Sequence, residues 1–168
     1  AEATPEQQEA EFSRFWQSLR HAATMVRERS EKASAEVIST GTGHCDAFHQ
    51  PRPVCDVPVI EPNCRTQYGC LYCVHYVCHS DEEDLHKLLS LQYVIHVVRN
   101  VVPDAAHADA LYKDLSIRIE LIIEALGERS NEVKKMIEIV KAKVFEYGIL
   151  TPFWERRLSR YEKVGVVF

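Results

Sequence analysis

Six cysteines, all between positions 45 and 78 of a 168-residue chain, are the side chains with the clearest capacity for chemistry. Three of them form the pattern Cys64-x5-Cys70-x2-Cys73. The backbone of a Cys-x2-Cys turn folds tightly enough to present two thiolates to one metal ion. Gly69, just before the turn, supplies conformational freedom. The pattern therefore predicts a structural metal site, for which zinc is the favoured ion.

A structural zinc ion takes four ligands, so the three cysteines leave one ligand to be found. We predict Cys45, in the run Gly43-His44-Cys45 about nineteen residues upstream, because that loop can fold back onto the Cys-x2-Cys turn. The predicted ligand set is Cys45, Cys64, Cys70 and Cys73. The spacing leaves four competitors open, namely Cys55, His75, Cys78 and His79.

Other chemistries use the same side chains. An iron–sulfur cluster takes the same ligands, and spacing does not separate it from zinc. A disulfide scaffold is typical of small secreted chains without a core, and this chain has strong helical periodicity and no secretion signal. Four thiolates leave no open position for catalysis. A zinc enzyme would need three ligands and a nearby carboxylate, for which Asp81 or Glu82 are the candidates, so we expect this chain not to be an enzyme.

The segment around the cysteines, residues 39–80, lacks the periodicity of a regular element. Glycines and prolines interrupt it at Gly41, Gly43, Pro51, Pro53, Pro58, Pro62 and Gly69. A loop of this length inside a compact domain needs a source of order other than its own apolar side chains. A bound metal ion would supply that order.

The first element that must support this segment is a helix predicted from residue 4 to about residue 36. Thr4 and Gln7 form a capping box around Pro5, which suits the first helical position. Apolar residues then recur at three- and four-residue spacing, at Phe12, Phe15, Trp16, Leu19, Ala22, Ala23 and Val26.

Four more helices are predicted after His79. The first starts at the capping box Ser80–Glu83 and ends before Pro103, and the second runs from Asp104 to Gly127. Ser130 starts the third, which ends near Gly148, and Thr151-Pro152 opens a short last helix. Short connections between helices favour antiparallel packing.

The predicted fold class is all-α, an antiparallel helical bundle with an inserted zinc-knuckle loop region. We expect an N-terminal amphipathic helix over residues 1–40, a cysteine-rich metal-binding module over 41–80 and a helical bundle over 81–168.

The charge of the chain is −5 at pH 7 and is unevenly distributed. Residues 81–127 carry a net −5, whereas residues 128–168 carry a net +3. The candidates for a surface facing nucleic-acid phosphates are Lys134, Lys135, Arg156 and Arg157. A solvated surface of mixed sign explains the same counts and stays open as an alternative. No apolar run is long enough for a membrane span and no signal peptide opens the chain, so we expect a cytoplasmic location and no membrane partner.

The stretch from Cys64 to Tyr76, preceded by Gly43-His44-Cys45, resembles a cysteine module of tyrosine recombinases, the integrase-like proteins of transposons and integrative elements. In that module a Cys-Leu-x-Cys-x-His-aromatic run follows two upstream cysteines. The resemblance covers residues 43–80, under a quarter of the chain. It implies that the four matching cysteines are Cys45, Cys64, Cys70 and Cys73.

The resemblance also implies that this chain is the tail of a larger integrase-like protein, beyond any catalytic domain. Its expected role is DNA binding or assembly, with duplex DNA or other recombinase subunits or domains as partners. A tyrosine recombinase site needs two arginines, a lysine, histidines and a nucleophilic tyrosine, and His96-x-x-Arg99 is not followed by the remainder. We therefore predict no catalytic residue. The competing interpretation is a metal-stabilised protein-interaction module with no role at nucleic acid.

Overall fold

The computed structural model describes residues 3–27, 37–47, 49–54, 60–101 and 106–164, without the side chains of 11–19, 21, 100–101, 106–109 and 164. Its helices, in chain order, are α1 (Pro5–Met25), the 3₁₀ turn η1 (Gly69–Tyr72), α2 (Glu82–Val101), α3 (Ala106–Gly127), α4 (Asn131–Lys141), the π-helical turn η2 (Ala142–Glu146) and α5 (Pro152–Val164). The protein is therefore mostly helical, as its periodicity predicts.

The capping residues explain where several helices begin. Thr4 accepts a hydrogen bond from the Gln7 amide and Gln7 returns one to the Thr4 amide, which confirms the predicted capping box. Ser130 accepts from the Val133 amide at the start of α4, also as predicted. The start of α2 is one residue later than predicted. The N-cap is Asp81 instead of Ser80, because Asp81 Oδ1 accepts a hydrogen bond from the Asp84 amide.

The sequence predicted the length of α1 and its apolar side chains. The predicted helix to about residue 36 is wrong in its length, because α1 ends at Met25 and Val26 begins a strand. Val26 is β-branched and finds a strand partner at Cys78, so pairing replaces the helix there. The predicted apolar side chains at Phe12, Phe15, Trp16 and Leu19 lie outside the described residues.

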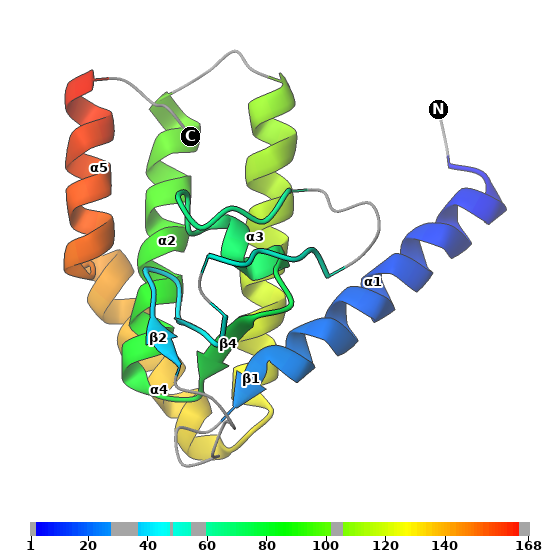
Figure 1. Ribbon diagram of the computed structural model, residues 1–168, viewed down its shortest axis with the longest axis horizontal. Helices are drawn as coiled ribbons and strands as arrows, with labels where there is room; N and C mark the ends of the chain where they lie inside the picture. Colours follow the sequence, from blue (N-terminus) through cyan, green and yellow to red (C-terminus); the bar gives the residue numbers. More distant parts are fainter. Residues whose placement is uncertain (1–2, 28–36, 48, 55–59, 102–105, 165–168) are drawn as a thin grey trace.

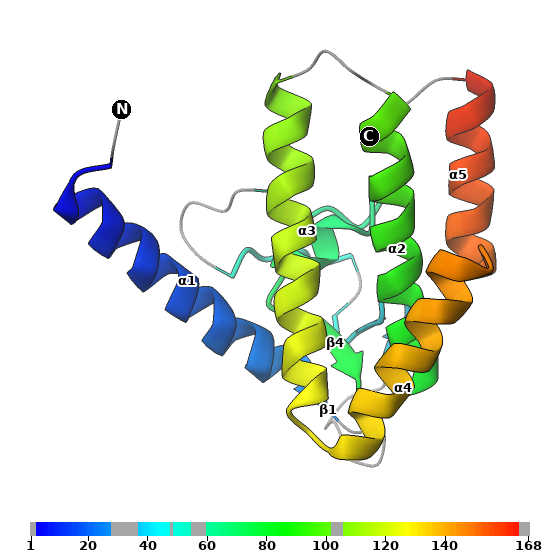
Figure 2. The same cartoon turned by 180° about the vertical axis from the view of Figure 1, so that it is seen from behind.

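The bundle is formed by α2 to α5 (Figures 1 and 2). Helices α2 and α3 lie side by side and run in opposite directions, and α4 runs opposite to α3. Antiparallel packing thus holds for these three helices, whereas α5 continues in roughly the direction of α4. Helix α1 leaves the body diagonally, and Ala22 and Met25 near its C-terminal end are buried.

One core joins the bundle to the cysteine-rich segment. Its largest fully buried side chains include Leu88, Leu115, Ile119, Ile122 and Trp154 from the helices. It continues into the cysteine-rich segment through a further set of buried side chains, Leu71, Tyr72, Tyr76 and Cys78. The segment is therefore packed against the bundle by apolar contacts as well as by any metal.

The prediction of an all-α fold is wrong, because the described residues also contain a small mixed sheet. Its strands are β1 (Val26–Arg27), β2 (Ile38–Ser39), β3 (His44–Cys45) and β4 (Tyr76–His79), in the order β1-β4-β3-β2. Strand β1 pairs with β4 in parallel, and the β4–β3 and β3–β2 pairs are antiparallel. Strands β1, β2 and β3 have two residues each and cannot show an alternating pattern, and β4 is buried at all four positions, so the sequence did not indicate the sheet.

The sheet and the cysteine-rich segment lie against one face of the α2–α3 pair, on the side opposite to α4 (Figures 1 and 2). Arg118 of α3 helps to hold them there, because its Nε donates to the Leu71 carbonyl at 2.9 Å from a buried position. None of the described helices has the length and apolarity that crossing a membrane requires.

Candidate metal centre

Two short elements position three of the four predicted cysteine ligands. Cys45 ends β3, Cys70 lies in η1, and Cys73 caps that turn, with its amide donating to the Cys70 carbonyl at 3.0 Å. Hydrogen bonds on both sides of Cys73 tie the turn to a neighbouring segment, from the Val54 amide to the Tyr72 carbonyl and from the Val74 amide to the Arg52 carbonyl. The Cys-x2-Cys turn thus has a fixed backbone on both sides.

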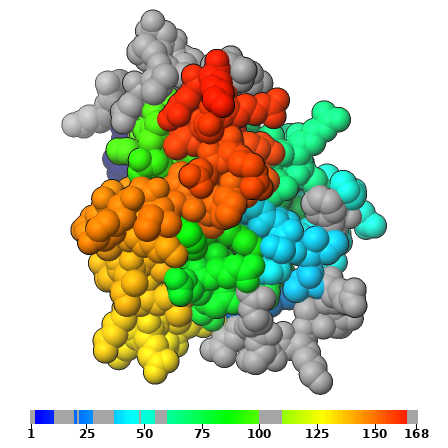
Figure 3. All heavy atoms as spheres, turned by 90° about the vertical axis from the view of Figure 1, so that its left-hand side faces the viewer, coloured from blue at the N-terminus to red at the C-terminus, as the bar shows by residue number. Residues whose placement is uncertain are grey.

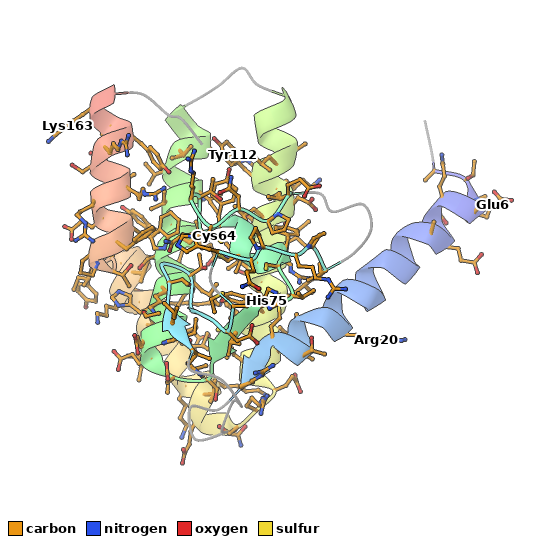
Figure 4. The ribbon with its side chains drawn as sticks, in the orientation of Figure 1. Glu6, Arg20, Cys64, His75, Tyr112 and Lys163 are labelled. Carbon is orange, nitrogen blue, oxygen red and sulfur yellow. The ribbon has the colours of Figure 1, made fainter. Side chains whose placement is uncertain are left out.

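The four predicted cysteines line one small cavity. Its wall consists of Cys45, Cys64, Cys70 and Cys73 together with Ala47, Pro51, Pro62, Asn63 and Tyr76. The cavity volume is about 10 Å³, roughly the space of one water molecule or one ion. Figure 4 shows Cys64 within the cysteine-rich segment, while Glu6 and Arg20 on α1 and Lys163 on α5 point away from it.

Hydrogen bonds reach three of these sulfur atoms. The Arg52 amide donates to Cys73 Sγ at 3.4 Å. Burial raises the pKa values of Cys45 and Cys70, and a bond from the Ala47 backbone and one involving the Thr42 side chain, respectively, offset part of that rise. Donors directed at sulfur favour the thiolate, which is the form that binds metal.

The environment otherwise opposes four negative charges. Burial raises the pKa of Cys45, and burial followed by the neighbouring sulfurs of Cys64 and Cys45 raises the pKa of Cys70 to about 12. Neighbouring thiolates repel one another, so this group can ionise together only with a cation among them. The cavity is therefore a candidate thiolate metal site.

The sulfur atoms stand slightly too far apart for a closed site. Within the described part of the chain, no three cysteine sulfurs lie within 4.8 Å of one another. Zinc–sulfur bonds of about 2.3 Å in a tetrahedron place the sulfurs about 3.8 Å apart. An ion bound by all four cysteines would therefore draw at least two sulfurs inward.

Among the described residues, the competing ligands His75, Cys78 and His79 are not part of this cavity wall. His75 Nδ1 lies 2.9 Å from Asp46 Oδ1. Cys78 is fully buried in the core, where its Sγ donates to the His79 carbonyl and burial raises its pKa. Cys55 lies outside the described residues, and His79 belongs to a second cluster.

The second cluster consists of His44, His79 and Asp84, all buried. His44 Nδ1 lies 2.9 Å from Asp84 Oδ2, His79 Nδ1 lies 3.2 Å from the same oxygen, and the two Nδ1 atoms are 3.2 Å apart. The His79 amide also donates to Asp84 Oδ2 at 2.8 Å. This group could hold a metal ion.

The other carboxylate oxygen of Asp84 faces Lys87. Lys87 Nζ lies 3.3 Å from Asp84 Oδ1 and donates to Ser39 Oγ and to the Gly43 carbonyl at 2.8 and 2.9 Å. Burial would raise the pKa of Asp84, but the hydrogen bonds from His44 and the His79 amide, together with Lys87, hold it below its usual value. Asp84 is therefore a buried, ionised carboxylate.

One strand supplies a residue to each cluster. Successive side chains of a strand point to opposite faces of a sheet. In β3, Cys45 lines the cysteine cavity and His44 contacts Asp84. The pairing of Cys45 with Tyr76 and of His44 with Val77 puts Tyr76 on the cysteine face and His79 on the other. The two clusters thus occupy opposite faces of β3 and β4.

Sequence reasoning missed His44 and Asp84 as a possible site and considered His79 only as a cysteine-site ligand. His44 and Asp84 are 40 positions apart, so no local spacing links them. The one available signal was the adjacency of His44 and Cys45. In a strand, neighbouring side chains point to opposite faces, so a predicted strand there would have suggested one site on each face.

The basic residues predicted to face phosphate have different surroundings. Lys134 and Lys135 on α4 and Arg156 on α5 are exposed. Arg157 is half-buried, with its guanidinium 4.9 Å from the centroid of the Phe153 ring and its Nη2 donating to the Arg65 carbonyl at 3.1 Å. Arg157 therefore fastens α5 to the cysteine-rich segment.

Comparisons of this chain with models of protein families, with curated proteins and with solved structures found no match.

Proposed function

We propose that this chain is a zinc-stabilised, non-catalytic domain that binds DNA or assembles with other subunits of an integrase-related protein. The observation that carries the metal part is the single small cavity lined by Cys45, Cys64, Cys70 and Cys73. One zinc ion held by four thiolates has no open position for substrate, so its role is to order the protein.

The ion would act on the least regular part of the fold. Between β3 and β4 the described chain contains only η1 and one isolated bridge, Pro53 with Cys73. Four ligands from β3, from the segment before η1 and from η1 itself would tie these pieces together. Metal-binding free energy would thereby become folding free energy.

The metal is tested by elemental analysis of the purified protein. We expect one thiolate-bound zinc per chain, lost in Cys64→Ser and Cys73→Ser and retained in the control Cys55→Ser. Cobalt(II) in place of zinc should give thiolate-to-metal charge-transfer absorption in the wild type and in the control. Unchanged cobalt absorption in both serine variants would refute this ligand set.

The DNA-binding part rests on the basic C-terminal region and on the recombinase-like cysteine module. Helices α4 and α5 and the η2 turn form one continuous face of the molecule (Figure 3). Exposed Lys134, Lys135 and Arg156 lie on these helices. Lysine and arginine side chains release counterions when they neutralise phosphates, so binding would weaken with salt by a log–log slope of about −0.9 per contact.

Fluorescence anisotropy with duplex DNA tests this role at low and physiological salt. We expect the double variant Lys135→Glu/Arg156→Glu to weaken binding to all sequences alike, because phosphate contacts carry no sequence information. The control Arg20→Glu/Lys113→Glu changes the net charge equally at exposed positions of α1 and α3. Equal loss in both variants would show that only net charge matters and would contradict a basic docking face.

The second candidate function is a protein-interaction module, and exposed apolar side chains favour it. Of the large apolar side chains that are exposed in the described part of the chain, four lie between positions 139 and 149. They are Ile139, Phe145, Tyr147 and Ile149. Absence of DNA binding at low salt would favour this apolar surface, which lies on α4, η2 and the turn after η2, as the functional one.

A further inference from the structure

The cluster of His44, His79 and Asp84 has the geometry of a ligand triangle. Its three donor atoms form sides of 2.9, 3.2 and 3.2 Å. A point about 2 Å from each atom, the usual zinc–nitrogen or zinc–oxygen distance, lies about 1 Å outside the plane of the triangle. Neighbouring ligands of a tetrahedral zinc ion stand about 3.3 Å apart, close to the separations found here.

Protons cannot satisfy all three contacts at once. With a proton on each Nδ1, both N–H groups point at Asp84 Oδ2, which already accepts the His79 amide, and the two ring nitrogens face each other as donors. With one proton in total, one imidazole nitrogen faces Asp84 Oδ2 lone pair to lone pair. A single cation meets all three lone pairs together.

We propose that His44 Nδ1, His79 Nδ1 and Asp84 Oδ2 bind a first-row divalent cation of the zinc class, at a second metal site separate from the cysteines. The two sites lie on opposite faces of β3 and β4, so one ion cannot serve both. Imidazole and carboxylate ligands suit such cations, and three protein ligands leave a coordination position for water.

The surroundings of Asp84 support this assignment. Ligating carboxylates are themselves hydrogen-bonded in metal sites, and here Asp84 Oδ2 accepts a hydrogen bond from the His79 amide. Lys87 forms an ion pair with Oδ1, on the side away from the two imidazoles. Lys87 is held in turn by Ser39 and Gly43, so it is a positioning residue. The carboxylates of Asp81 and Glu83 lie within 4.8 Å of Asp84 and offset the positive charge of Lys87.

Metal stoichiometry and the histidine NMR signals test the second site in the full chain. Zinc is added to metal-free protein, and zinc per chain is measured after dialysis. We expect two equivalents in the wild type, one in His79→Gln and one in Asp84→Asn. The control His96→Ala, at an exposed position of α2, should keep two.

The wild type provides a readout that does not depend on any variant folding. Zinc should shift the imidazole nitrogen resonances of His44 and His79 and leave those of His96 unchanged. Unshifted His44 and His79 resonances, or equal zinc content in wild type and His79→Gln, would overturn the proposal and leave a buried hydrogen-bond network.

The two metal sites can fail independently. Cys64→Ser should abolish cobalt–thiolate absorption and still retain the histidine-bound equivalent. His79→Gln should do the reverse. Zinc that shifts the two histidines in a protein without thiolate absorption would support the second site and refute the first.

Discussion

Lys87 is a buried lysine whose Nζ has four oxygen partners, on Ser39, Gly43, Glu83 and Asp84. Replacing it with methionine keeps most of the side-chain volume but leaves Asp84 as a buried charge without its ammonium partner. Breaking a buried ion pair in this way costs about 3 kcal/mol, and we expect Lys87→Met to lower the free energy of unfolding by about that amount. Urea denaturation measures it. The exposed Lys113→Met should change stability by less than about 0.5 kcal/mol, and equal effects would contradict the inference.

Gly41 is in close contact with two aromatic side chains of α5, those of Phe153 and Trp154. Its carbonyl accepts from Trp154 Nε1 at 2.7 Å, and a Cβ placed on it would stand 2.6 Å from two carbons of the Phe153 ring. We expect Gly41→Ala to destabilise the protein by about 1–3 kcal/mol through overcrowding. A thermal unfolding scan checks this against Gly127→Ala, where the added carbon meets Ile137 at an ordinary 3.5 Å. A stable Gly41→Ala protein would mean that Phe153 moves aside freely.

At the scale of elements, the turn that ends η2 depends on a left-handed glycine. Gly148 has φ +66°, its amide donates to the Val144 carbonyl at 3.0 Å, and nothing lies within 4 Å of where a Cβ would be. The cost of Gly148→Ala is therefore conformational, about 1 kcal/mol, and Gly148→Asn should cost less because asparagine tolerates this region. Equal unfolding midpoints for the alanine and asparagine variants would contradict this explanation.

The helices were predictable because their signals are local. Thr4, Ser130 and Gly148 mark helix ends by their own chemistry, and a period of about 3.6 residues spans many positions of α2 to α4. The sheet has no such signal, since β1, β2 and β3 are two residues long and their partners lie far away in sequence. The end of α1 at Met25 depends on its partner strand for the same reason.

The two candidate sites also differ in whether a local sequence signal indicates them. The four cysteines could be grouped from their spacing and composition. The cluster around Asp84 could not, because a buried carboxylate at the start of a helix reads as an ordinary acidic first turn. Only the tertiary fold shows that Asp84 of α2 contacts His44 of β3.

At the scale of the whole molecule, metal removal should act unevenly. The helices of the bundle supply most of the shared apolar core, whereas Cys64 and Pro62 lie in a segment with little regular structure. On the proposed function, we expect a chelator to speed amide hydrogen exchange between residues 46 and 75 while the core amides of α2 and α3 stay protected. Exchange that rises uniformly would show that the ion supports the entire fold, and unchanged exchange would count against a structural ion.

The alternation of His44 and Cys45 along β3 bears on how this sheet avoids mispairing. Two residues make too few backbone hydrogen bonds to define which residue faces which, and a slip by one position turns every side chain to the opposite face. In this strand a slip would present an imidazole to the three remaining cysteines and a thiol to Asp84. Each wrong neighbour would break a ligand set, so the side chains themselves would discriminate against the slipped sheet.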